Sequence, residues 1–168
     1  MNISMYNASI PTFVRMFDNL NTILDKGAAY AEARKIDPSV LINYRLFPDM
    51  FPLSRQVQIA SDISKGCAAR LAGAEPPKYE DNEASFADLK ARVNKTVAYI
   101  QGFKPSQIDG TEDKDINLKI GGRDMQFKGL PYLLNFVIPN VYFHITTTYA
   151  ILRHCGVEVG KMDFLGKF

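Results

Sequence analysis

The chain has 168 residues, of which 46% are hydrophobic and 23% are charged, the composition of an ordinary globular protein. This length fits a single domain over residues 1–168, large enough to bury roughly two-thirds of its unfolded surface. The 20 basic and 18 acidic residues leave a formal charge of only +2. Because the basic residues form no run, we expect no nucleic-acid partner.

The N-terminal residues and the cysteines indicate a cytoplasmic protein. The opening stretch, MNISMYNASIPTF, has neither a positive start nor an apolar core, so no secretory signal is expected. Cys67 and Cys155 form no CxxC pattern. We therefore expect two free thiols in a reducing compartment.

The first long helix is predicted over Met5 to Ala33. Its apolar residues recur in steps of three and four, which places them on one helical face: Tyr6, Ile10, Phe13, Phe17, Leu20, Leu24, Ala28 and Ala31. Pro11 lacks a backbone N–H. Regular helix is therefore expected to begin near Ser9, with Ser9 as its cap, or an earlier turn bends at Pro11.

A connector over residues 36–52 follows. Asp37-Pro38 can open a short helix, and the two prolines of Phe47–Pro52 exclude a long one. Its aromatic residues either pack over one end of the bundle or form a lid, and packing is the favoured interpretation.

The second long helix is predicted from Leu53 or Ser54 to Ala72, and Gly73 ends it. Its buried stripe consists of Val57, Ala60, Ile63, Cys67 and Leu71, with Gln56, Gln58 and Asp62 on or beside it. The Pro76-Pro77 loop separates it from a third helix over about Glu83 to Gly102, whose Lys90, Arg92, Asn94 and Lys95 are expected to face water.

Residues 103–129 break the helical pattern. Ile116, Leu118 and Ile120 alternate with polar residues, as in a strand. Gly121-Gly122 suits a two-residue hairpin turn, and the return strand follows it. A small hairpin is therefore predicted before the last helix.

The last helix is predicted from Leu130 to Leu152, a stretch without Asp, Glu, Lys or Arg. Its stripe runs through Leu134, Val137 or Ile138, Val141, Ile145, Tyr149 and Leu152. A membrane span has this length, but the Asn, His and Thr residues within it favour a helix buried in a bundle, so no membrane partner is expected. Pro139 cannot bond the carbonyl of Asn135, which predicts a kink or a fresh start.

The last helix also carries the candidate site. Asn140, His144 and Thr148 are spaced i, i+4, i+8, so they lie along one edge of an apolar helix. His144 is either a core histidine bonded to a neighbouring helix or a functional residue facing Gln58 or Asp62 of the second helix. His154, in the last turn, suits the helix dipole instead.

Four long helices and one hairpin predict an all-α fold, a four-helix bundle with a small β-hairpin before the last helix. In such a bundle a divalent metal, zinc or nickel, could bind His144 and Asp62, with Asn140 and Gln58 as weaker ligands. Catalytic zinc normally has three protein ligands. No HExxH, GxGxxG, P-loop or GxSxG motif occurs. Cys67 could pair with His144, but buried cysteine is usually inert.

The order of three helices, a hairpin and a last helix resembles the DinB/YfiT-like superfamily of bacterial helical bundles. The likeness is carried by MYNASIPTFVRMFDNL, FPLSRQVQIASD and NVYFHITTTYAILRHCGVEVGK. Together these segments are similar to an uncharacterised domain-of-unknown-function branch of that superfamily. The resemblance implies a DinB-like bundle over nearly the whole chain and a homodimer, since two-fold assemblies are common.

In typical superfamily members, one histidine of the second helix and two of the last helix bind a divalent metal. By resemblance, the last-helix pair falls on Asn140 and His144, and the second-helix position falls near Gln58, with Asp62 one turn on. This chain keeps one histidine of the three. Some relatives are metal-dependent, thiol-conjugating transferases or isomerases.

Three hypotheses follow. The first is an uncharacterised bundle protein with a small polar pocket lined by Gln58, Asp62, Asn140 and His144. The second is a metal-dependent transferase or hydrolase that uses His144 as a ligand and a metal-bound water; it requires His144 and Asp62 to point at a common spot. The third is a module that binds a small molecule without catalysis.

Overall fold

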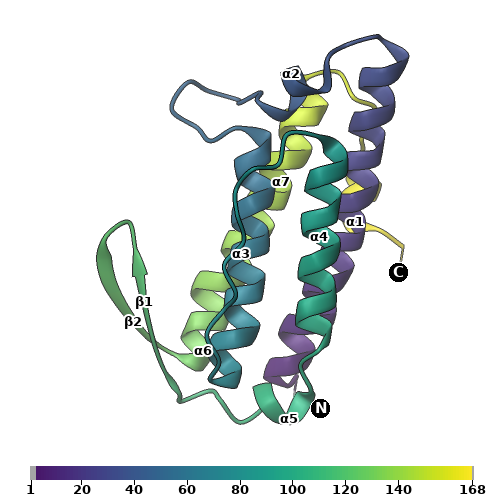
Figure 1. The fold of residues 1–168 in the computed structure, drawn as a ribbon. Helices are drawn as coiled ribbons and strands as arrows, with labels where there is room; N and C mark the ends of the chain where they lie inside the picture. Colours follow the sequence, from purple (N-terminus) through teal and green to yellow (C-terminus); the bar gives the residue numbers. More distant parts are fainter. Residues whose placement is uncertain (1–2, 168) are drawn as a thin grey trace.

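The four predicted stripes become four long helices that enclose one core (Figure 1). In the computed structural model, which describes residues 3–167, these are α1 (Met5–Ala33), α3 (Leu53–Ala72), α4 (Phe86–Gln101) and α7 (Ile138–His154). The shorter elements are α2 (Pro38–Ile42), α5 (Pro105–Ile108), β1 (Asp115–Ile120), β2 (Arg123–Lys128), α6 (Gly129–Pro131), the π-helical turn η1 (Tyr132–Val137) and α8 (Lys161–Leu165). The four-helix bundle with a hairpin before the last long helix is confirmed.

Each long helix packs against two others: α1 against α4 and α7, and α3 against α4 and α7. Figure 1 shows α3 and α4 running in the same direction, so the chain between them must return along the length of the bundle. We call this returning segment, residues 74–85, the strap. It begins after Gly73, whose φ of 79° ends α3, and it reaches Ser85, which caps α4.

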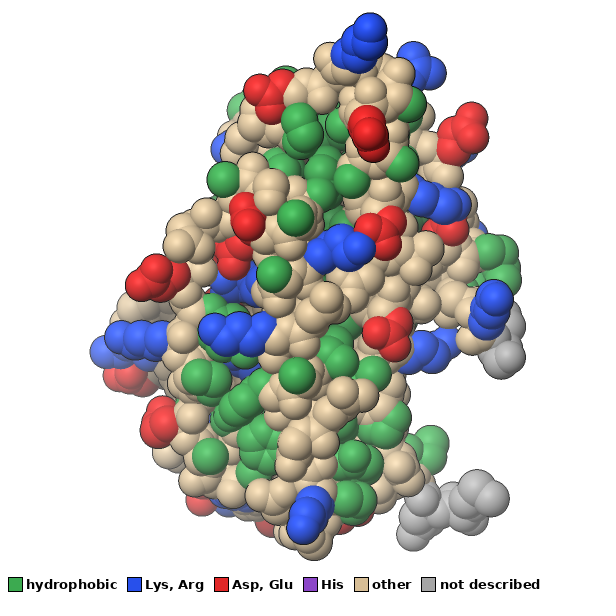
Figure 2. All heavy atoms as spheres, turned by 45° about the vertical axis from the view of Figure 1, so that its right-hand side comes forward, with side chains coloured by type: hydrophobic (Ala, Val, Ile, Leu, Met, Phe, Trp, Pro, Cys, Tyr) green, Lys and Arg blue, Asp and Glu red, His purple; other side chains and the backbone are tan. Residues whose placement is uncertain are grey.

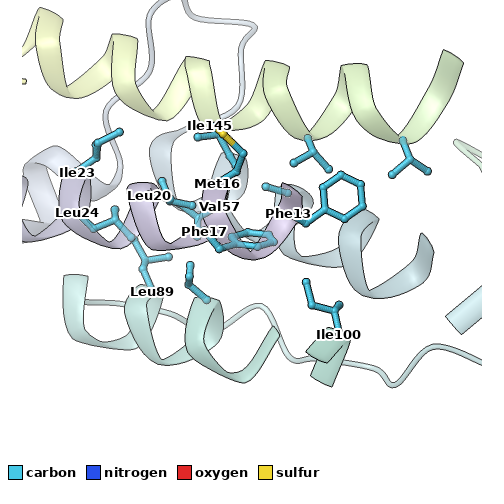
Figure 3. Packing of buried hydrophobic residues seen from close by; sticks show 14 of the residues in the cluster. Phe13, Met16, Phe17, Leu20, Ile23, Leu24, Val57, Leu89, Ile100 and Ile145 are labelled. Atoms are coloured by element: carbon cyan, nitrogen blue, oxygen red, sulfur yellow. The ribbon is translucent and has the colours of Figure 1, made fainter. Parts of the chain in front are cut away.

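The core lies along α1, whose buried side chains pack towards both α4 and α7 (Figure 3). Phe13, Phe17 and Leu20 are completely buried. Figure 3 shows them between Ile145 of α7 on one side and Leu89 of α4 on the other, with Val57 of α3 close by. Burial of these large apolar side chains is the main force that holds the bundle together.

Helix α1 begins at Met5 and not near Ser9. The cap is Ser4, whose Oγ accepts the N–H of Asn7 at 3.2 Å, while the Ser9 hydroxyl donates to the carbonyl of Met5 at 2.7 Å. The predicted Ser9 cap is therefore wrong. Pro11 lies inside the helix, and the carbonyl of Asn7 that it cannot bond accepts the Thr12 hydroxyl at 3.4 Å.

Pro139 is accommodated by a π-helical turn directly before it, η1, where the sequence predicts a kink. A π turn holds an extra residue, so the side chains on its N-terminal side rotate relative to those of α7. As a result Tyr132 and Leu133 are buried, whereas Leu134, predicted on the buried stripe, is exposed.

Helix α4 begins at Phe86, three residues later than predicted. The Ser85 hydroxyl accepts the N–H of Asp88 at 3.1 Å, and the Asp88 carboxylate accepts the N–H of Ala84 at 3.1 Å. The first bond satisfies a free donor of the first turn, and the second satisfies the N–H of the residue before the cap. Glu83 is therefore left in the strap, where its side chain can turn inward.

The hairpin has the predicted register, with Ile116 opposite Phe127 and Leu118 opposite Met125. Gly121 and Gly122 form its turn, at φ values of 54° and 82° that favour glycine. Phe127 packs near Tyr132 and Phe136, with ring centroids 5.9 Å and 5.5 Å apart. Ile116, at the base of the hairpin, is also buried, whereas the turn end of the hairpin stands away from the bundle (Figure 1).

The surface on the side of α1 and α4 mixes basic and acidic side chains with hydrophobic ones (Figure 2). No histidine side chain is visible from this direction. Among residues 3–167, no helix combines the length and the apolar character that crossing a membrane would require.

Candidate functional site

The site is centred on His144 of α7, where that helix packs against α3. The His144 side chain is buried, with only 8% of the residue exposed. Its Nδ1 lies 2.7 Å from Oε1 of Gln56, in the first turn of α3. The Gln56 amide nitrogen in turn donates to the carbonyl of Phe51 at 3.0 Å.

These two bonds determine which nitrogen of His144 carries the proton. A backbone carbonyl can only accept, so the Gln56 NH2 group must face Phe51 and its Oε1 must face the imidazole. An amide oxygen also only accepts, so His144 Nδ1 carries the proton and donates it. In the neutral ring, Nε2 is then left with a free lone pair.

The lone pair on Nε2 reaches the surface. This atom makes no hydrogen bond within residues 3–167 and is not among the buried polar atoms left without a partner. Burial, and secondly the positive charge of Arg55, lower the pKa of His144 from 6.5 to about 4. The ring is therefore neutral at pH 7 and presents an acceptor.

Two aromatic residues belong to this site: Phe143 lies beside the His144 ring, and Phe51 anchors Gln56 through its carbonyl. The ring of Phe143 meets that of His144 edge-on, with centroids 5.2 Å apart. Phe143 and Phe51 are both exposed although large and apolar. The site thus pairs one oriented acceptor with exposed aromatic surface.

The other polar residues of the row satisfy the backbone of α7 itself. The Asn140 amide donates to the carbonyl of Phe136 at 2.6 Å, one of the carbonyls beside Pro139. The Thr148 hydroxyl donates to the carbonyl of His144 at 3.0 Å. Asn140 therefore has a structural role next to the proline, and of the row it is His144 that bonds to α3.

Gln58 and Asp62 face the strap and α4. Gln58 donates to Glu83 at 2.9 Å and accepts from Arg55 at 3.2 Å. Asp62 accepts from Arg92 of α4 at 2.9 Å and also pairs with Lys65. Asp62 lies six residues after Gln56, about 240° further round a helix of 3.6 residues per turn, so it points away from the side of α3 that meets His144.

The metal hypothesis needs ligands that converge, and the described carboxylates do not join His144. Among residues 3–167, no group of three or more His, Cys, Asp or Glu side chains is placed to hold a metal ion. Within the described part of the chain, His144 keeps an unbonded ring nitrogen, Nε2, whose direction is set by the Gln56 contact. Asp62 and Gln58 are instead held by contacts with α4 and the strap.

The thiols and the second histidine are separate from the site. Cys67 is fully buried, and this burial raises the pKa of its thiol to about 12, so it stays protonated. His154 lies exposed at the end of α7, where its Nε2 is 2.9 Å from the Tyr44 hydroxyl.

Sequence reasoning missed two roles: Gln56 was placed on or beside the buried stripe but not as the partner of His144, and Arg92 was assigned to water. Gln56 lies four residues before Ala60 and therefore on the buried stripe of α3. Arg92 lies three residues after Leu89 and four before Thr96, on the buried face of α4, and the prediction that it faces water is wrong, since the residue is only 4% exposed. A polar side chain that falls on an apolar helical stripe is thus predicted to be buried and to bond to another buried group.

Comparison with known proteins agrees with the fold and supplies a family. Residues 5–165 match the model of a domain of unknown function, DUF1993. The crystal structure of a DinB family member protein from Shewanella denitrificans superposes with a TM-score of 0.87 at 42% sequence identity, over 97% of this chain and 92% of that one. No curated protein matched. The chain therefore belongs to the DUF1993 family and has the DinB-like bundle.

Proposed function

We propose that this protein is a binding module for a small molecule, which it recognises through a hydrogen bond from the ligand to Nε2 of His144. The observation that carries the proposal is the 2.7 Å contact between His144 Nδ1 and Gln56, with Gln56 itself anchored on Phe51. This chain of bonds leaves an acceptor of defined direction at the surface. A ligand with an O–H or N–H donor and an apolar ring fits both the acceptor and the aromatic surface of Phe51 and Phe143.

The acidity of the ring supports binding over proton transfer. A general base works best with a pKa near the operating pH, whereas His144 has a pKa of about 4. Such a ring accepts a hydrogen bond at pH 7 but removes a proton poorly. Cys67 lies apart from the site, and its protonated thiol supplies no nucleophile.

The experiment compares two probes that differ only at the oxygen substituent. Phenol has an apolar ring and an O–H donor, and anisole replaces that hydrogen with a methyl group. Binding is followed by the ¹⁵N shift of His144 Nε2 in labelled protein. Phenol should shift this signal in a saturable way, anisole should not, and the phenol effect on neighbouring amides should disappear in His144→Phe but persist in His154→Phe. Equal responses to both probes would contradict the proposal.

A second candidate is the metal-dependent transferase or hydrolase in which His144 is a metal ligand. One observation favours it: histidines that bind metals usually donate their other ring N–H to an oxygen acceptor, as His144 does to Gln56. Metal analysis of untagged protein separates the two. Stoichiometric zinc or nickel that is lost in His144→Ala would favour this second function over the first.

A further inference from the structure

A positive charge lies beside Phe51, the residue that anchors Gln56, which is the partner of His144. Arg55 directly precedes Gln56 in α3, and its guanidinium carbon lies 5.9 Å from the centre of the Phe51 ring. Arg55 is also the charged group whose field reaches the His144 ring. The same aromatic residue thus contacts Arg55 and supplies the carbonyl that anchors Gln56.

Arg55 uses only part of its hydrogen-bonding capacity. Both of its hydrogen bonds within residues 3–167 are made by Nη1, to Gln58 at 3.2 Å and to the carboxylate of Asp81 in the strap. A guanidinium has five N–H donors in a planar fork. The edge formed by Nε and Nη2 is therefore open, and this is the edge that can bind a carboxylate with two parallel bonds.

The Asp81 contact is one that a ligand can displace. The side chains of Arg55 and Asp81 are 37% and 41% exposed, and ion pairs so accessible to water contribute little to stability. Arg92 behaves differently, because its side chain and that of its partner Glu83 are only 2% and 8% exposed. Arg92 also pairs with Asp81 at 3.1 Å, so the strap stays attached through Arg92 when Asp81 releases Arg55.

We propose that the ligand of the His144 site is a small organic anion that carries a hydrogen-bond donor, that Arg55 binds its carboxylate, and that Asp81 is the internal counter-ion with which this ligand competes. This inference rests on the proposed function, because it assigns a charge to the ligand that donates to His144. It gives the strap a second role besides joining α3 to α4: its Asp81 holds Arg55 in the absence of ligand.

The test measures affinities by calorimetry for phenol and for 3- and 4-hydroxybenzoate, which add a carboxylate to the same ring and hydroxyl. One of the two acids should bind about tenfold more tightly than phenol, as expected for a charge-assisted pair. Arg55→Gln should remove this preference, so that the acid binds this variant no more tightly than phenol does. Asp81→Asn should strengthen binding of the acid about threefold or more, since it removes the competing charge without changing the side-chain shape.

Glu80→Gln is the matched control, because it removes one negative charge from the strap at a side chain that does not contact Arg55. It should leave the affinity for the acid within twofold of the wild-type value. An effect of Glu80→Gln as large as that of Asp81→Asn would overturn the role of Asp81. If phenol binds through His144 and neither acid binds more tightly, the anion proposal fails while the proposed function stands. If no probe shifts His144, both fail.

Discussion

His144 and Gln56 form the hydrogen-bonded pair at the centre of the site. A buried imidazole must bond its polar atoms or lose their hydration, and Gln56 satisfies one nitrogen while the other reaches the surface. Because the ring is held neutral by burial, the pair should affect how the fold responds to acid.

We predict that, because of His144, the free energy of unfolding decreases as the pH falls from 6.5 to 4. An unfolded histidine takes up a proton as the pH falls through about 6.5, but folded His144 does so only near pH 4. The unfolded state therefore binds more protons than the folded state in this window. The contribution of neutral His144 to the free energy of unfolding is fully present above pH 6.5, and it decreases by at most about 3 kcal/mol as the pH falls to 4. Urea unfolding of wild type and His144→Gln at several pH values measures the difference.

His144→Gln should lack this part of the acid loss, whatever its stability at pH 7. His154→Gln serves as the control, because it removes the exposed histidine, and it should keep the wild-type profile. Parallel profiles for wild type and His144→Gln would show that His144 is not buried as a neutral ring.

At this scale the sequence predicts the location of the site better than its partners. His144 was predicted to face the second helix, and it does so. Its partner is Gln56 and not Gln58 or Asp62. These two residues follow Gln56 by two and six positions, which turns them about 200° and 240° around the helix, away from His144. Asn140 lies on the same edge of α7 as His144, but its amide donates to the carbonyl of Phe136 within α7 and makes no bond to α3 among the described residues.

Among the elements, the strap shows how a long connection is held against a bundle. Arg92 of α4 donates to the carbonyl of Glu80 at 3.0 Å and to the carboxylate of Glu83 at 2.8 Å. The same guanidinium pairs with Asp81 at 3.1 Å and with Asp62 of α3 at 2.9 Å. One buried side chain thus ties the strap to two helices.

We predict that Arg92→Met destabilises the protein by about 3–5 kcal/mol, because it leaves several carboxylates without their buried counter-charge. The midpoint of urea unfolding measures the loss. Lys90→Met is the matched control on the same helix: Lys90 pairs with Asp25 in a more exposed position, so less than about 1 kcal/mol should be lost. Equal losses for the two variants would show that the Arg92 cluster is not essential to the strap.

Hydrophobic periodicity predicts the buried face of a helix only where the helix is regular. The stripes of α1, α3 and α4 predict their buried faces because each helix is regular. In the last helix, the π turn before Pro139 shifts the register, and the sequence shows the proline but not the extra residue. Arg92 was misplaced for another reason: its charge suggested water, although its phase along α4 indicated the core.

At the scale of the whole molecule, the bundle and its hairpin were predicted from four stripes and one Gly-Gly turn, and this part is confirmed. Within residues 3–167, the hairpin and the α6 and η1 turns after it expose four large apolar side chains: Ile120, Met125, Leu130 and Leu134. Exposed apolar groups of this kind often mark an interface.

We therefore expect the homodimer implied by the family resemblance to form through this surface. Leu134→Glu should shift the protein from dimer to monomer in sedimentation experiments, because a charge would be buried in the interface. Val40→Glu changes another exposed apolar residue, in α2 at the opposite end of α1, and should leave the dimer intact. A wild-type protein that sediments as a monomer would contradict the expectation.

The claim on which the account depends is that His144 is neutral, with its proton on Nδ1 and a free lone pair on Nε2. Long-range ¹H–¹⁵N correlation spectra of uniformly labelled protein at pH 7 report the protonation of each ring nitrogen directly. We predict a protonated Nδ1 and an unprotonated Nε2 for His144. A proton on Nε2, whether in the other neutral tautomer or in the imidazolium ion, would contradict the account.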